Sequence, residues 1–180
     1  PPNRAAPAAA SATVPTASVA SIPAGYYDAA AGKTGAALAS ALHTIVSDQS
    51  KISYDAVWNA LMATDRDPAN SSNVIELYTG RSIAASNHGG NLGQWNREHV
   101  WAKSHGDFGE VIGPGTDLHH LRPEDVQVNS IRGNKDFDNG GSPVSGASGS
   151  YTDGDSFEPR DAVKGDVARM ILYMDVRYDG

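Results

Sequence analysis

The sequence has 180 residues, contains no cysteine and carries a formal net charge of −7 at pH 7. The length suits a single domain. The lack of cysteine excludes disulfide frameworks and thiolate metal sites, and no apolar run approaches the roughly 20 residues that a membrane helix needs. The acidic balance argues against simple nucleic-acid-binding proteins, which usually carry a basic patch.

Residues 1–21 are mostly Ala, Pro, Ser, Thr and Val, with a single charge at Arg4. Such a composition cannot form a packed core and predicts a flexible leader. It shows no signal-peptide pattern, because no charged start is followed by a continuous apolar run. The alternative is a cloning or linker remnant. We expect the globular domain to occupy residues 22–180.

Hydrophobic periodicity predicts several elements along the rest of the chain. Apolar residues at i, i+4, i+7 and i+8 predict an amphipathic helix over residues 35–47, and a second short helix is expected after Ser53. Residues 74–78 have the composition of a strand. Residues 138–155 are rich in Gly and Ser and are predicted to form a loop, and residues 160–177 carry the apolar stripe of a last helix. The pattern indicates an α+β domain that is mainly helical.

The central stretch from Trp95 to Asp136 holds four of the six histidines, namely His99, His105, His119 and His120. Apolar and polar residues alternate around His99, which predicts a strand. Neighbouring side chains of a strand point to opposite faces. Glu98 and His99 can therefore serve one site only if the strand bulges there or ends at His99.

A second strand-like run covers residues 117–123, and Pro123 with the two acids after it resembles a helix start. Asn129 would then lie in the second turn of that helix. The predicted order of strand, loop, strand and helix makes a compact finger that can hold one metal ion.

The residue types in this finger suit phosphodiester chemistry. A hard cation such as Mg²⁺ prefers oxygen ligands and keeps several waters, so the carboxylate of Glu98 and the amide oxygen of Asn129 are a plausible protein share. A neutral His99 could take a proton from a water aimed at phosphorus. The metal would offset charge on the phosphoryl oxygens, and an arginine would bind the phosphate bidentately.

Three motifs carry a family resemblance, namely Trp-Asn-Arg-Glu-His-Val-Trp at 95–101, Asp-Leu-His-His-Leu-Arg-Pro at 117–123 and Val-Asn-x-x-Arg-Gly-Asn at 128–134. Together they resemble the endonuclease I family of bacterial secreted and periplasmic nucleases, which belongs to the His-Me finger (ββα-metal) nucleases. The resemblance covers roughly residues 25–178. It implies a His-Me finger core embedded in a mixed domain.

Carried over position by position, the resemblance implies that His99 is the general base and that Glu98 and Asn129 bind the metal. The cofactor is expected to be Mg²⁺, with Mn²⁺ or Ca²⁺ as alternatives. Arg132 matches the family motif and is expected to act at the catalytic site. A structural ion pair from Arg132 to Asp125 or Asp136 is the alternative.

The resemblance further implies an endonuclease that cleaves DNA, RNA or both with little sequence preference and leaves 5′-phosphate and 3′-hydroxyl ends. We expect a secreted or periplasmic monomer without a membrane partner. Relatives carry further sequence after the helix that here ends near Tyr178, so the domain could lack a C-terminal portion. Some also have a phosphate-binding arginine in the loop at 102–116, where this chain offers only Lys103. The remaining candidates for that role are Arg97, Arg122, Arg132 and Arg169.

Two other functions stay open at this stage. One is a catalytically silent module that binds nucleic acid or a partner protein. The other is a zinc hydrolase, because zinc favours nitrogen ligands and the central stretch is rich in histidine. A zinc site would use His99, His105, His119 and His120, but the chain has no His-Glu-x-x-His motif.

Overall fold

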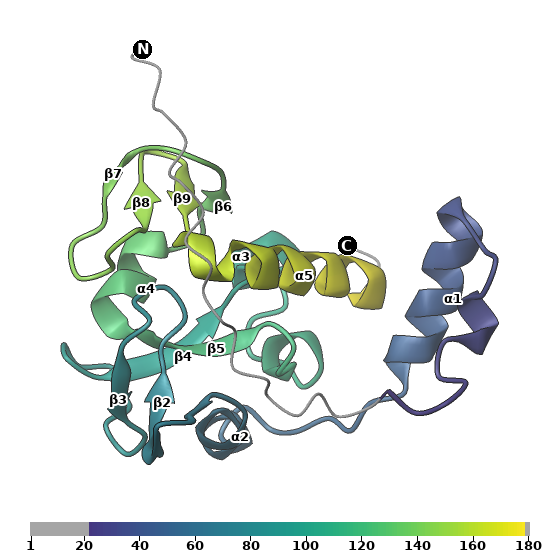
Figure 1. The fold of residues 1–180 in the computed structure, drawn as a ribbon, viewed down its shortest axis with the longest axis horizontal. Helices are drawn as coiled ribbons and strands as arrows, with labels where there is room; N and C mark the ends of the chain where they lie inside the picture. The colour runs from purple at the N-terminus through teal and green to yellow at the C-terminus, as the bar shows by residue number, and fades with distance from the viewer. Residues whose placement is uncertain (1–21, 179–180) are drawn as a thin grey trace.

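The computed structural model describes residues 22–178, so the leader expected over residues 1–21 lies outside the described part (Figure 1). None of the helices within 22–178 is long and apolar enough to cross a membrane. The helices are η1 Asp28–Ala30, α1 Gly35–Ser47, α2 Ala56–Thr64, α3 Lys103–Gly106, η2 Pro114–Thr116, α4 Val126–Arg132 and α5 Asp161–Tyr178. The strands are β1 Arg66–Asp67, β2 Asn70–Ile75, β3 Ser82–Ala84, β4 Trp95–His99, β5 Leu121–Asp125, β6 Asp136–Phe137, β7 Ser142–Pro143, β8 Tyr151–Thr152 and β9 Ser156–Glu158.

The predicted order of two strands and a helix is present, but the second strand, β5, begins at Leu121 and not at residue 117. Strands β4 and β5 pair antiparallel without a bulge, from Trp95 opposite Asp125 to His99 opposite Leu121. Helix α4 follows β5 directly and packs against both strands. The residues around Pro123 lie in β5, so the expectation that they start the helix is wrong. The strand continues to Asp125, whose carboxylate accepts hydrogen bonds from the first free amides of α4 and so fixes the helix start one residue later.

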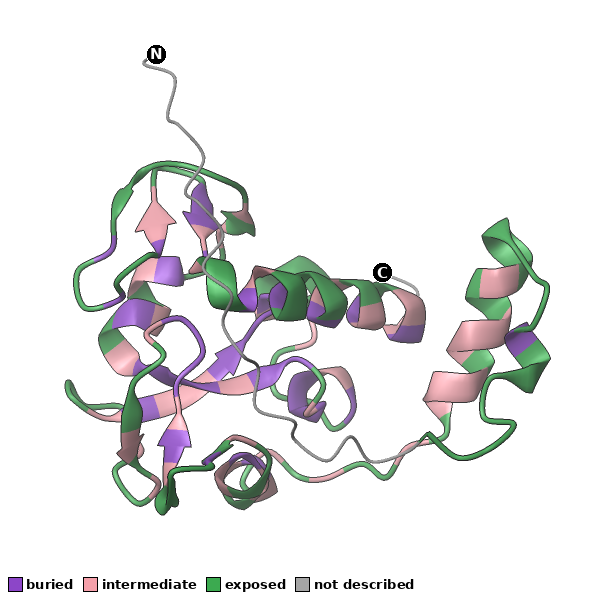
Figure 2. Ribbon diagram, in the orientation of Figure 1, coloured by how far each residue is buried: buried purple, intermediate pink, exposed green. Residues whose placement is uncertain are grey.

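The helices predicted from hydrophobic periodicity are confirmed. Helix α1 has the predicted limits of 35–47, α2 follows Ser53, and α5 covers the last predicted stripe. No residue of α1 is fully buried. It stands apart from the body of the domain and approaches the end of α5 (Figures 1 and 2).

The α+β class is confirmed, but the expectation of a mainly helical domain is wrong, because 36% of the described structure is helix and 20% is strand. Strands β6 to β9 form a four-stranded sheet, of which β7 and β8 lie in the stretch 138–155 that was expected to be a loop and β6 and β9 flank it. They are two or three residues long, too short for an alternating pattern to appear. The turn before β7 needs glycine, because Gly141 has φ +88 and a Cβ there would run into the backbone of Thr152.

Two hydrophobic clusters hold the finger in place, and Figure 2 shows the buried residues gathering around it. Trp95 at the start of β4 packs with Leu61 of α2 and Leu121 of β5. Val100, directly after β4, packs in the other cluster with Val128 of α4 and residues of α5. Because β4 is anchored at both ends, its side chains keep fixed positions.

Candidate active site

A pocket of about 490 Å³ lies beside β4 and brings together the three principal residues expected from the sequence, His99, Glu98 and Asn129. Its other lining residues include polar, basic and aromatic side chains, namely Tyr54, Trp58, Asn96, Arg97 and Lys103. The pocket therefore contains a base, oxygen donors and positive charge within one space.

His99 is the last residue of β4, which is the second of the two arrangements that would let it share a site with Glu98. Its Nε2 lies 3.0 Å from the carbonyl oxygen of Gly115. A carbonyl only accepts hydrogen bonds, so Nε2 carries the ring proton and Nδ1 keeps its lone pair. Burial lowers the pKa of His99 to about 3, and the ring is neutral at physiological pH.

Glu98 is held from one side by two donors. The Tyr78 hydroxyl donates to its Oε1 at 2.7 Å, and the Arg132 guanidinium donates to the same oxygen at 2.9 Å. Burial raises the pKa of this carboxyl, and the positive charge of Arg132 opposes that rise. A cation in the pocket would favour the ionised form in the same way as Arg132 does.

Asn129 lies on α4 opposite β4, and its Nδ2 donates to the Oδ1 of Asn96 at 2.7 Å. This bond does not use the Oδ1 of Asn129, which is the atom expected to bind a cation. Asn96 was not foreseen as part of the site. It is two residues before Glu98 on the same strand and so lies on the same face, a signal that was available in the sequence.

Arg132 is almost fully buried, with 2% of its surface exposed. Its guanidinium donates to Glu98 and to the backbone carbonyls of His99 and Val100. Its ion-pair partner is thus Glu98, and neither Asp125 nor Asp136 fills that place. The catalytic role expected for Arg132 stays a prediction, and the contacts made by this side chain suit a residue that positions Glu98 and the end of β4.

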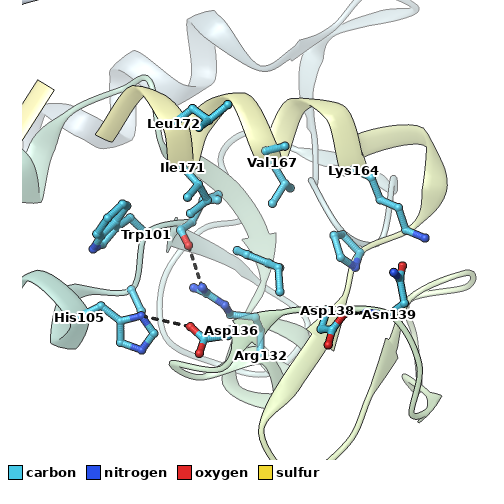
Figure 3. Close-up of a pocket in the computed structure, with 15 residues that line it drawn as sticks. Trp101, His105, Arg132, Asp136, Asp138, Asn139, Lys164, Val167, Ile171 and Leu172 are labelled. Atoms are coloured by element: carbon cyan, nitrogen blue, oxygen red, sulfur yellow. Dashed lines mark hydrogen bonds and ion pairs between the residues drawn. The ribbon is translucent and has the colours of Figure 1, made fainter. Parts of the chain in front are cut away.

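Arg132 also lines a second, more apolar pocket of about 740 Å³ beneath α5 (Figure 3). In this pocket Ile171 and Val167 extend from the helix, and His105 pairs with Asp136 at 3.6 Å. Neither His99 nor Glu98 lines this space. The catalytic chemistry is therefore better placed in the smaller pocket.

The other central histidines each have their own hydrogen-bond or ion-pair partners, and the ring of His120 lies edge-on to that of His99, with centroids 5.5 Å apart. The Nε2 of His120 lies 2.8 Å from the carbonyl oxygen of Pro114, and burial lowers the pKa of His120 to about 4. His119 pairs with Asp117 and stacks on Tyr173. Within residues 22–178 no three His, Asp or Glu side chains form a group that could hold a metal. The described part of the chain thus lacks the histidine cluster that the zinc alternative requires.

Asp117 is the centre of a buried hydrogen-bond network that the sequence did not reveal. Its Oδ2 accepts from the hydroxyls of Tyr173 and Tyr178, each at 2.9 Å, and from Gln49 at 3.1 Å. Burial alone would raise the pKa of Asp117, but the hydrogen bonds from His119 and the two tyrosines hold it below its ordinary value. Asp117 lies two residues after Gly115, whose carbonyl faces Nε2 of His99.

Comparison with known proteins shows that the profile of the family described as Endonuclease I matches residues 34–180. The chain belongs to the endonuclease I family. A protein named extracellular ribonuclease from Bacillus amyloliquefaciens is 68% identical over 155 residues, which are 86% of this chain and 54% of that protein. One with the same name from Bacillus subtilis (strain 168) is 65% identical over 155 residues, with the same shares covered. The chain spans about half the length of these curated relatives.

Proposed function

We propose that this member of the endonuclease I family is a divalent-metal-dependent endonuclease that hydrolyses phosphodiester bonds of DNA, RNA or both. The observation that carries the proposal is the convergence of His99, Glu98 and Asn129 on one pocket, with Nε2 of His99 engaged by Gly115. Family membership supports nuclease activity. The β4–β5–α4 unit is proposed to be the His-Me finger of that family.

In the proposed reaction, Nδ1 of His99 removes a proton from a water molecule as the water oxygen attacks phosphorus. A new P–O bond forms, the bond from phosphorus to O3′ breaks, and O3′ leaves with the bonding electrons and takes a proton from solvent. The products are a 5′-phosphate and a 3′-hydroxyl. The step does not use the 2′-hydroxyl, so both DNA and RNA fit it.

The oxygen donors of Glu98 and Asn129 suit Mg²⁺, with Mn²⁺ or Ca²⁺ as substitutes. Both residues line the same pocket, and the hydrogen bonds from Tyr78 and Arg132 go to only one oxygen of Glu98. When bound, the ion would offset negative charge on the phosphoryl and leaving oxygens. Arg132 would contribute by keeping Glu98 ionised and oriented.

The relatives named extracellular ribonucleases support secretion of this protein. A periplasmic location is the alternative in a host with two membranes. We propose that the enzyme acts as a monomer on nucleic acid. Weak electrostatic binding is expected for an acidic protein, so cleavage should slow as salt rises.

The test is cleavage of supercoiled plasmid and of a structured RNA by the wild type and by His99→Ala, with Mg²⁺ or with EDTA. General-base catalysis contributes about 10²–10⁴-fold, and a loss of that size is expected for His99→Ala. His105→Ala is the matched control, because His105 lines the other pocket. Cleavage that survives His99→Ala, or that is equal in EDTA, would contradict the proposed mechanism.

The catalytically silent binding module makes a different prediction in the same experiment. It would retard the plasmid or the RNA in a gel shift and cut neither of them in any divalent ion. A zinc hydrolase would contain stoichiometric zinc by elemental analysis after purification.

A further inference from the structure

Four arginines were candidates for binding the phosphate, and three of them have guanidinium groups engaged elsewhere. Arg132 is buried against Glu98 and backbone carbonyls. Arg122 donates to the carbonyls of Leu118 and Leu121, and Arg169 pairs with Asp166 on the exposed face of α5. Of the four, only Arg97 lines the pocket that holds His99.

Aromatic side chains fix the position of Arg97. The central carbon of its guanidinium lies 3.4 Å from the ring centre of Tyr54 and 4.0 Å from that of Trp58. Its Nη1 also donates to the backbone carbonyl of Tyr54 at 2.6 Å. A guanidinium has five N–H donors in one plane, so a group stacked in this way can still present donors to a ligand. The cost of ordering this arginine is met before any ligand arrives.

The carboxylates of Glu110 and Asp55 act on the charge of Arg97 through space, but neither forms an ion pair with it. No Asp or Glu within residues 22–178 forms an ion pair with it, whereas Lys103 in the same pocket pairs with Glu110 at 3.2 Å. The side chain is half-buried in a chain of net charge −7. A partly desolvated cation without an ion-pair partner among the described residues, held rigidly by aromatic rings, is a site suited to an anion.

Arg97 is also close to the proposed base. The Tyr54 ring that supports the guanidinium stacks on the ring of His99, with centroids 5.9 Å apart and planes at 29°. Arg97 and His99 also lie two residues apart on β4, so their side chains leave the same face of the strand, and both line the same pocket. An anion held by Arg97 in this pocket would share it with His99.

We propose that Arg97, supported by Tyr54 and Trp58, binds a phosphate of the substrate strand next to His99. This inference rests on the proposed function. In it, Arg97 has the role of the phosphate-binding arginine that the loop at 102–116 lacks. The planar fork would hold two non-bridging oxygens of one phosphate. A lysine would keep the charge but would lose both the fork and the stacking.

The experiment compares Arg97→Gln and Arg97→Lys with Arg169→Gln, an exposed arginine of α5. Hydrogen bonds to charged groups are strong enough that Arg97→Gln should lower kcat/KM by roughly 10- to 100-fold. Arg97→Lys should recover only part of that loss. Arg169→Gln should stay within about twofold of the wild type, as expected for an exposed ion pair.

Binding of a fluorescein-labelled single-stranded oligonucleotide supplies a readout that a structural role would not move. It is measured by anisotropy as a function of salt, in the His99→Ala background so that the probe stays intact. Loss of one phosphate contact should reduce the slope of log affinity against log salt by about 0.7 for a single strand. The Arg169→Gln protein should keep the full slope.

The outcomes separate this inference from the proposed function. Normal kcat/KM in Arg97→Gln, or a loss of activity with an unchanged salt slope, would overturn the inference while leaving the nuclease intact. A wild type that cuts nothing in any divalent ion, but whose salt slope falls on Arg97→Gln, would overturn the proposed function alone. A wild type that cuts nothing in any divalent ion, together with no binding of the oligonucleotide by the His99→Ala protein, would overturn both.

Discussion

Two regions of the site each hold an arginine, Arg97 on β4 and Arg132 at the end of α4, and the surroundings of the two arginines are opposite. In the interior, Arg132 meets a carboxylate, two carbonyls and an aromatic ring, and its charge is balanced by Glu98. At the pocket, Arg97 rests on Tyr54 and Trp58 and forms no ion pair with an acidic residue of the described chain. A paired, buried charge fixes the geometry of the site, whereas a half-buried charge without an ion-pair partner is available to a ligand.

The largest stability effect should come from the interior region. Arg132→Met leaves Glu98 buried without its partner, and breaking a buried pair from one side costs about 3–5 kcal/mol. The loss should be smaller at acidic pH, because a protonated Glu98 no longer needs a positive neighbour. Urea unfolding at neutral and acidic pH measures both quantities.

A double variant sharpens this test. Glu98→Gln combined with Arg132→Met removes both charges, so it should recover part of the stability lost in Arg132→Met alone. If Arg132→Met unfolds at the same urea concentration as the wild type, the interior pair does not fix the site, and the contrast with Arg97 fails.

The second prediction concerns the buried His120, whose pKa is lowered to about 4 by burial. Below pH 6.5 the unfolded chain protonates this histidine, whereas the folded chain does so only near pH 4. The contribution of neutral His120 to the free energy of unfolding is therefore complete above pH 6.5 and is lost as pH falls towards 4. His120→Gln cannot titrate. The stability gap between the wild type and this variant should therefore shrink by up to about 1.4 kcal/mol per pH unit below 6.5.

The control for this pH effect is Val144→Ala, a buried substitution that also destabilises but removes no titrating group. The difference in free energy of unfolding between this variant and the wild type should stay constant over the same pH range. A constant gap for His120→Gln would mean that this histidine does not resist protonation in the fold, and that the interior does not hold its groups in one charge state.

Local patterns in the sequence were enough to find the helices and the finger. The apolar stripes of 35–47 and 160–177 repeat over several turns, and such a signal survives whatever packs against the helix. His99 and Asn129 are only 30 residues apart in the sequence. The two strands, the helix and their site residues therefore fall in one continuous segment and could be predicted together. The alternation around Glu98 could have added Asn96, which shares its face.

The features that escaped prediction depend on contacts between distant segments. Tyr54 and Trp58 meet Arg97 only because α2 packs near β4, and nothing in the spacing along the chain indicates this stacking. Asp117 gains Tyr173 and Tyr178 from the far end of α5. The β6–β9 sheet is made of strands too short to leave a periodic signal.

The smallest predicted effect tests whether the Asp117 network acts on the site through His99. Tyr173→Phe and Tyr178→Phe each remove one hydrogen bond to the Asp117 carboxylate, and a hydrogen bond to a charged group contributes about 1.5–3 kcal/mol of stability. Because Asp117 is two residues after Gly115, a looser network should let the Gly115 carbonyl drift from Nε2 of His99. We expect kcat to fall by roughly two- to tenfold, a range set by the loss of one neutral hydrogen bond.

Nitrogen NMR of the His99 ring distinguishes this positioning effect from simple destabilisation. In the wild type the proton should reside on Nε2, because a carbonyl faces that atom. In Tyr173→Phe the Nδ1-protonated tautomer should gain population, and that form cannot accept a proton from water at Nδ1. The exposed Tyr27→Phe is the control and should change neither the tautomer nor kcat. A lower kcat with an unchanged tautomer would mean that the tyrosines stabilise the fold without orienting the base. The hydrogen bonds to Asp117 would then have no effect on the position of His99 in the pocket.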